Sequence, residues 1–189
     1  MGINFCAIID HALSQTEITS FDRSLQGEWQ QDTSPLRRMA AMPGRTDWEW
    51  NFQAAAATPE QEYTARGCLE FEGPADLDGT MYPRGLDLGS AIRWGTFLSD
   101  HETQLSLCRA TRRIASMVRG HTIIYLPDTI IGGCALDILH EAGDINAVLA
   151  CLARDYGQPA PYFEVLAQRW TGWDAEGDRY NYLIEYLAP

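Results

Sequence analysis

The sequence contains no lysine, because arginine supplies all 14 of its basic residues. This absence excludes a P-loop lysine, a lysine that forms a Schiff base with pyridoxal phosphate, and a lysine general base. Long apolar runs are missing too, since no stretch approaches the roughly 18–20 residues that a membrane-spanning helix needs. The N-terminal segment has no basic flank and reaches an acid at Asp10, unlike a secretory signal. We therefore expect no membrane association and no secretion.

Closely spaced cysteines are also lacking. The five cysteines are odd in number and widely separated, and no CxxC pair occurs. Apolar neighbours surround each of them, as is typical of free thiols in a reducing compartment rather than of a disulfide framework or a zinc site. We expect a cytoplasmic protein without a metal ion or a cofactor.

The charge is strongly one-sided, with 26 acidic residues against 14 basic ones and a net charge of −12. Nucleic acid is excluded as a ligand by this balance, because binding phosphates needs a basic surface. A basic protein partner would suit the charge, although acidity also serves solubility alone.

The patterning predicts one globular domain over residues 1–189 that contains both strands and helices. Polar and apolar residues alternate as in half-buried strands, and a loop or hairpin over residues 76–85 separates two of the strand segments. The expected strands cover residues 3–9, 47–53, 68–72, 86–93, 121–126 and 180–187. The run over residues 121–126 is nearly all apolar, which predicts a strand buried on both faces.

Helices are expected mainly in the C-terminal half. Ser99 and Glu102 have the spacing of a capping box ahead of a long helix that Gly120 ends. Further helices are expected over residues 15–26, 135–141 and 144–156, the last capped by Asp144. The predicted fold class is α+β, a two-layer sandwich with a mostly antiparallel sheet and helices packed on one face.

Cys134 is the best nucleophile candidate, because Gly132 and Gly133 precede it at the expected start of a helix. A helix N-terminus stabilises a thiolate, and either His121 or His140 could serve as its base. The alternative is a small apolar residue at a tight loop-to-helix junction. Asp128 follows the most apolar strand and could point into a cleft, or it could be a turn residue.

Candidate partner-binding residues fall into two groups. Arginines concentrate on the long helix, where they could bind an acidic partner or form a solvated face paired with nearby acids: Arg109, Arg112, Arg113 and Arg119. Three of the six tryptophans and an acidic loop could contact a basic partner: Trp29, Trp170, Trp173, Asp174, Glu176 and Asp178.

Other motifs are incomplete. The stretch from Asp76 to Gly79 resembles the start of a calcium loop but lacks the later acidic ligands, so a solvated turn is favoured. His101 and Glu102 do not continue into the HExxH pattern of zinc proteases.

One layout resembles that of small bacterial α+β proteins: Arg93-Trp94 and Phe97-Leu98, the arginine-bearing helix, and the stretch from Ile124 to Asp128. The resemblance covers the C-terminal half and implies no activity.

Two functions remain open. The first is a non-enzymatic acidic protein that binds a basic protein partner, as immunity-type inhibitors do, with no catalytic residue. The second is a small enzyme with a cleft around Asp128 or around Cys134 and a histidine. The missing catalytic motifs favour the first. The oligomeric state is left open.

Overall fold

The computed structural model describes residues 3–31, 33–36, 51–54, 69–73, 77–142, 144–170 and 181–188. Its seven strands are β1 (Asn4–Asp10), β2 (Asn51–Ala54), β3 (Leu69–Gly73), β4 (Leu77–Met81), β5 (Gly85–Arg93), β6 (Thr122–Pro127) and β7 (Leu183–Tyr186). The helices are α1 (Gln15–Thr19), α2 (Phe21–Trp29), α4 (Trp94–Ser99), α5 (His101–Met117), α6 (Ile130–Ala142), α7 (Ile145–Asp155) and α8 (Phe163–Arg169).

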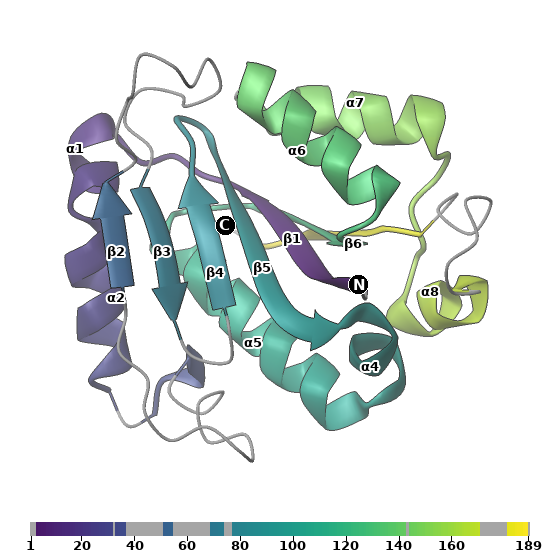
Figure 1. The fold of residues 1–189 in the computed structure, drawn as a ribbon, viewed down its shortest axis with the longest axis horizontal. Coiled ribbons are helices and arrows are strands. Elements are labelled where there is room, and N and C mark those ends of the chain that lie inside the picture. The colour runs from purple at the N-terminus through teal and green to yellow at the C-terminus, as the bar shows by residue number, and fades with distance from the viewer. Residues whose placement is uncertain are drawn as a thin grey trace.

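All named strands form one sheet in the order β2-β3-β4-β5-β1-β6-β7, and every pairing between them is antiparallel (Figure 1). β1 lies inside the sheet between β5 and β6, and its residues 5–9 are buried. β6 is buried along its whole length, as its apolar run predicts. The α+β class and the antiparallel sheet are therefore confirmed.

Helices cover both faces of the sheet, which corrects the expectation of a single helical layer (Figure 1). The odd-numbered residues of β1, such as Phe5 and Ile9, join a core with α1, α2, α4, α5 and α8. The even-numbered residues Cys6 and Ile8 join a second core with α6 and α7. Two apolar faces on the central strands require cover on both sides, because burying apolar area is the main stabilising term.

β4 and β5 form a tight hairpin, which resolves the loop-or-hairpin alternative for residues 76–85. Tyr82 N–H donates to the Gly85 carbonyl at 2.7 Å, so Pro83 and Arg84 form the turn. Leu77 and Met81 of β4 point into the first core, which leaves Asp78 and Thr80 on the opposite face.

The long helix α5 starts and ends differently from the sequence-based expectation. Its N-cap is Asp100, whose carboxylate accepts the Thr103 N–H at 3.0 Å. Ser99 instead ends α4 and donates its hydroxyl to the Gly95 carbonyl. At the other end Arg119 adopts a left-handed φ of 57°, while the Gly120 N–H donates to the Ala115 carbonyl at 2.8 Å. This is a Schellman ending with arginine at the position that glycine usually occupies.

Gly120 is required for a different reason, because the backbone of β1 lies very close to it. A Cβ on Gly120 would collide with the backbone carbonyl of Asp10 at the end of β1. The glycine therefore lets the chain leave α5 directly against the sheet.

Smaller differences concern element boundaries. The helix expected over residues 15–26 is two helices, α1 and α2. They meet at Ser20, whose backbone conformation is not α-helical. α6 begins at Ile130, five residues earlier than the 135–141 helix predicted, whereas the Asp144 cap of α7 is confirmed. The alternating segment 47–53 overlaps β2, but Trp48 and Trp50 lie outside the described residues.

Candidate functional site

The sheet face that carries α6 and α7 is only partly covered by them within the described part of the chain. Both helices pack on β1 and β6, and Leu139 of α6 extends as far as Gly85 at the start of β5. Beyond this point Figure 1 shows no described helix in front of β4 and β5. We call this part of the sheet, which no described helix covers, the acidic face and define it by four residues: Asp78 and Thr80 of β4, and Asp87 and Gly89 of β5.

The acidic face owes its composition to strand alternation. Asp78 is exposed, and Thr80, Asp87 and Gly89 are half-buried, whereas their neighbours along β4 and β5 are buried in the first core. In the antiparallel register Asp78 is the partner of Gly89, and Thr80 is the partner of Asp87. The two carboxylates therefore come from adjacent strands on the same side of the sheet.

Asp87 has the most perturbed carboxyl of the acidic face. Its Oδ1 accepts the backbone N–H of Thr80 at 2.7 Å. Burial raises the pKa of Asp87 to about 7, and repulsion from the Asp78 carboxylate adds to the rise. The Thr80 hydrogen bonds act in the opposite direction but do not offset these effects. Asp87 therefore changes its charge near neutral pH.

Asp78 is placed over the backbone of β5. A Cβ built on Gly89 would lie 2.8 Å from Asp78 Oδ1, so only glycine leaves room for the carboxylate in this position. Glu72 and Glu70 of β3 occupy the backbone register positions opposite Asp78 and Thr80. The sequence thus places two more acids at neighbouring positions of the sheet.

Cys6 lies beside this pair on β1, as the backbone partner of Gly89. Its thiol is buried, and burial raises its pKa well above the ordinary value. The carboxylates of Asp87, Asp128 and Asp78 raise it further. An unreactive, protonated thiol is the expected state at neutral pH.

Two histidines and a tyrosine lie around the β4–β5 turn. The Tyr82 hydroxyl and His140 Nε2 share a hydrogen bond, and their ring centroids are 4.7 Å apart. His11 donates from Nε2 to the Tyr82 carbonyl at 2.6 Å. These contacts connect β1, the hairpin and α6 at one point.

The structure separates the residues of the proposed thiol site. Cys134 lies inside α6 rather than at its N-terminus, because the helix starts at Ile130; the expected dipole stabilisation of its thiolate is therefore lost. His121 precedes β6 and Cys134 lies beyond the other end of that strand, whereas His140 is bonded to Tyr82. No described contact joins Cys134 to either histidine.

Asp128 is a turn residue that closes the β1–β6 ladder, which is the alternative considered for it. Its Oδ1 accepts the Asn4 N–H at 2.5 Å, and its own N–H donates to the Asn4 carbonyl at 3.0 Å. Both hydrogen bonds join the start of β1 to the end of β6, and they fix the orientation of the Asp128 carboxylate.

Most arginines of α5 form ion pairs with acidic residues of other elements. This agrees with the alternative of a solvated face paired with nearby acids. Arg112 lies 2.7 Å from Glu185 of β7, and Arg113 pairs with the buried Glu28 of α2. Arg109 is exposed on α5. An additional acidic partner would therefore compete with internal carboxylates for two of these three residues.

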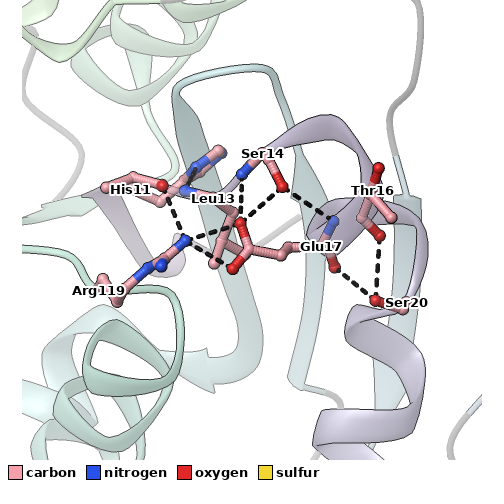
Figure 2. A network of polar contacts seen from close by, with 8 residues as sticks. His11, Leu13, Ser14, Thr16, Glu17, Ser20 and Arg119 are labelled. Atoms are coloured by element: carbon pink, nitrogen blue, oxygen red, sulfur yellow. Dashed lines mark hydrogen bonds and ion pairs between the residues drawn. The ribbon is translucent and has the colours of Figure 1, made fainter.

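Arg119 belongs to a network at the start of α1, which Figure 2 shows. One guanidinium nitrogen donates to the Ala12 carbonyl at 2.9 Å and to both Glu17 carboxylate oxygens at 2.8 Å. Glu17 also accepts the Ser14 N–H at 2.7 Å, which completes the capping box of α1. The network fastens the end of α5 to the start of α1.

The aromatic candidates are only partly available to a partner. Trp29 and Trp170 are half-buried and pack against the first core. The remaining members of this prediction lie outside the described residues: Trp173, Asp174, Glu176 and Asp178.

Sequence reasoning did not single out Asp87. The available signal is an acid between two leucines in a strand, Leu86-Asp87-Leu88, which alternation places on the face opposite the core. The pattern around Asp78 indicates only an incomplete calcium loop. Among the described residues no group of three potential metal ligands is present, and no helix is long and apolar enough to cross a membrane.

Comparison of the chain with protein-family models, with curated proteins and with solved structures finds no match.

Proposed function

We propose that the protein binds a basic protein partner through the acidic face, and that an immunity-type inhibitor is the kind of protein it represents. The observation that carries the proposal is the pair Asp78 and Asp87, which lie on one side of adjacent strands in a part of the sheet that no described helix covers. The proposed activity is binding, and no bond is made or broken.

The electrostatics of the acidic face support this partner. Burial is the largest cause of the raised pKa of Asp87, and repulsion between the Asp87 and Asp78 carboxylates adds to it. An arginine or lysine side chain of a partner would relieve that repulsion and would favour the ionised form of Asp87. The net charge of −12 would also accelerate the encounter with a basic surface.

The arginines of α5 make a less suitable binding surface than the acidic face. Arg112, Arg113 and Arg119 each pair with an acid of the same chain. An acidic partner at α5 would therefore compete with these internal carboxylates.

A cytoplasmic setting is part of the proposal. Four cysteines in the described part of the chain are free thiols: Cys6, Cys108, Cys134 and Cys151. Free cysteines are typical of reducing compartments.

The test is affinity capture from a native lysate with the tagged full chain, followed by salt elution. We expect a stoichiometric basic protein that is released as ionic strength rises, because exposed charges are screened. The Asp78→Asn/Asp87→Asn double variant should weaken its binding at least tenfold, whereas Glu164→Gln on α8 serves as the matched control. Capture of no stoichiometric protein, or equal capture by both variants, would contradict the proposal.

A further inference from the structure

His11 occupies the connector between β1 and α1, and backbone groups surround both of its ring nitrogens. The residue is 9% exposed. Nε2 lies 2.6 Å from the Tyr82 carbonyl, and Nδ1 lies 3.2 Å from the Leu13 nitrogen. The backbone N–H of His11 also donates to the Arg84 carbonyl at 3.3 Å. The residue therefore joins the connector to the β4–β5 turn.

The Tyr82 carbonyl and the Leu13 N–H together favour one protonation state of the ring. A carbonyl can only accept, so Nε2 must carry a proton towards Tyr82. The Leu13 N–H can only donate, so Nδ1 must present a lone pair. The neutral tautomer with hydrogen on Nε2 satisfies both demands, whereas the imidazolium would direct a second N–H at the Leu13 N–H.

We propose that His11 is a pH-sensitive latch: its neutral ring fastens the connector, residues 11–14, to the β4–β5 hairpin, and protonation of Nδ1 releases the connector. The step adds one proton from solvent to Nδ1 and breaks the hydrogen bond from Leu13.

The surroundings of His11 disfavour the charged ring. Burial lowers the pKa of His11, and the positive charge of Arg119 lowers it further. Hydrogen bonds to the Tyr82 and Gly85 backbone and the carboxylate of Asp10 act in the opposite direction. Protonation therefore becomes easier when the connector moves away and the ring reaches water.

The latch lies at a junction, so its release affects several elements. Arg119 bonds the Ala12 carbonyl inside the connector, and Ser14 caps α1 at its end (Figure 2). On the other side of His11, Tyr82 contacts His140 of α6, and the same hairpin carries the acidic face. This inference does not depend on the proposed binding function.

His140 behaves differently on protonation, which gives the proposal its specificity. Its Nε2 faces a tyrosine hydroxyl, which can either donate or accept. A His140 ring with hydrogen on Nε2 can donate to the Tyr82 oxygen, so protonation need not break this hydrogen bond. His101 and His121 are exposed, so their substitution provides the control for removing a histidine elsewhere in the chain.

The test measures amide hydrogen exchange at Leu13 in the full chain between about pH 5 and pH 8, corrected for the intrinsic exchange rate. We expect the opening constant of this amide to be flat above about pH 6.5, the ordinary pKa of histidine, and to rise by up to tenfold per pH unit below it. The rise should disappear in His11→Gln and persist in His101→Gln and His121→Gln. A flat wild-type profile, or a rise that survives in His11→Gln, overturns the latch.

A second measurement needs no variant and keeps the test decisive if His11→Gln fails to fold. The long-range ¹H–¹⁵N spectrum of the wild-type imidazoles should show hydrogen on Nε2 of His11 at neutral pH, with a titration midpoint below that of free histidine. Hydrogen on Nδ1, or a midpoint at or above the free value, overturns the proposal.

Discussion

Arg119 donates to both carboxylate oxygens of Glu17 at 2.8 Å, across a sequence separation of 102 residues. The arginine makes this contact from a left-handed backbone conformation with φ of 57°, which costs a non-glycine residue about 1 kcal/mol. The side chain and the backbone of Arg119 therefore have opposite effects on stability.

Two substitutions separate these effects. Arg119→Gly and Arg119→Ala both lose the contacts to Glu17 and Ala12, but only glycine relieves the backbone. We expect the alanine variant to be less stable than the glycine variant by about 1 kcal/mol. Urea denaturation at pH 7 measures the difference. Equal midpoints for the two variants would show that the left-handed conformation is not retained in solution.

The Arg113–Glu28 pair is the arginine contact on α5 that should matter most for stability. Glu28 is 4% exposed and Arg113 39% exposed, and the Arg113 guanidinium lowers the pKa of the Glu28 carboxyl. Arg113→Ala would leave the buried carboxylate with its Ser34 hydrogen bond but without its charged partner, at a cost on the order of 2 kcal/mol.

The matched control is Arg112→Ala, because Arg112 is more exposed and its partner Glu185 is also partly exposed. A loss below about 1 kcal/mol is expected there, as for surface ion pairs. Equal losses for the two variants in urea denaturation would contradict the structural difference between the pairs.

Much of the fold follows from patterns within short segments of sequence. Alternation identifies β3 and β5, the apolar run identifies the doubly buried β6, and Asp144 identifies the start of α7. The placement of helices on both sides of the sheet is different, because it depends on which face of β1 each helix covers. Phe5 and Cys6 are both apolar, and nothing in their order indicates separate cores.

The candidate site was harder to predict, because it depends on register between strands. Asp78 and Asp87 become neighbours only through the antiparallel pairing of β4 with β5. Cys134 is the opposite case, because a local sequence pattern alone predicted a reactive thiol at a helix N-terminus. The helix continues through Gly132 and Gly133, so the thiol is moved away from the dipole end.

Substitutions at the N-terminus of α5 test which residue, Ser99 or Asp100, caps the helix. Ser99 and Asp100 are both good capping residues, but only the Asp100 carboxylate accepts the Thr103 N–H. Asp100→Ala should lower the thermal midpoint of the protein, because α5 then has an unsatisfied N–H in its first turn. Ser99→Ala should leave the midpoint nearly unchanged. The opposite order, in a thermal scan followed by circular dichroism, would restore Ser99 as the cap.

Asp87 should make the stability of the protein depend on pH in an unusual direction. Its pKa is about 7 in the folded chain, whereas an unfolded aspartate has a pKa near 3.8. Between these two values the folded state binds more protons at this site than the unfolded state does. The contribution of Asp87 therefore makes the free energy of unfolding decrease as pH rises from about 4 to 7, by at most about 1.4 kcal/mol per pH unit. Above pH 7 the contribution is constant, because both states are ionised.

Asp87→Asn isolates this contribution, because an asparagine oxygen can still accept the Thr80 N–H but cannot ionise. We expect the variant to be more stable than the wild type at pH 8 and to lose the advantage towards pH 4. The control is Asp137→Asn on the exposed side of α6, which should parallel the wild type at every pH. Urea denaturation of the three proteins at four pH values decides the matter: a stability difference between Asp87→Asn and wild type that stays constant with pH would mean that Asp87 is already ionised in the folded chain.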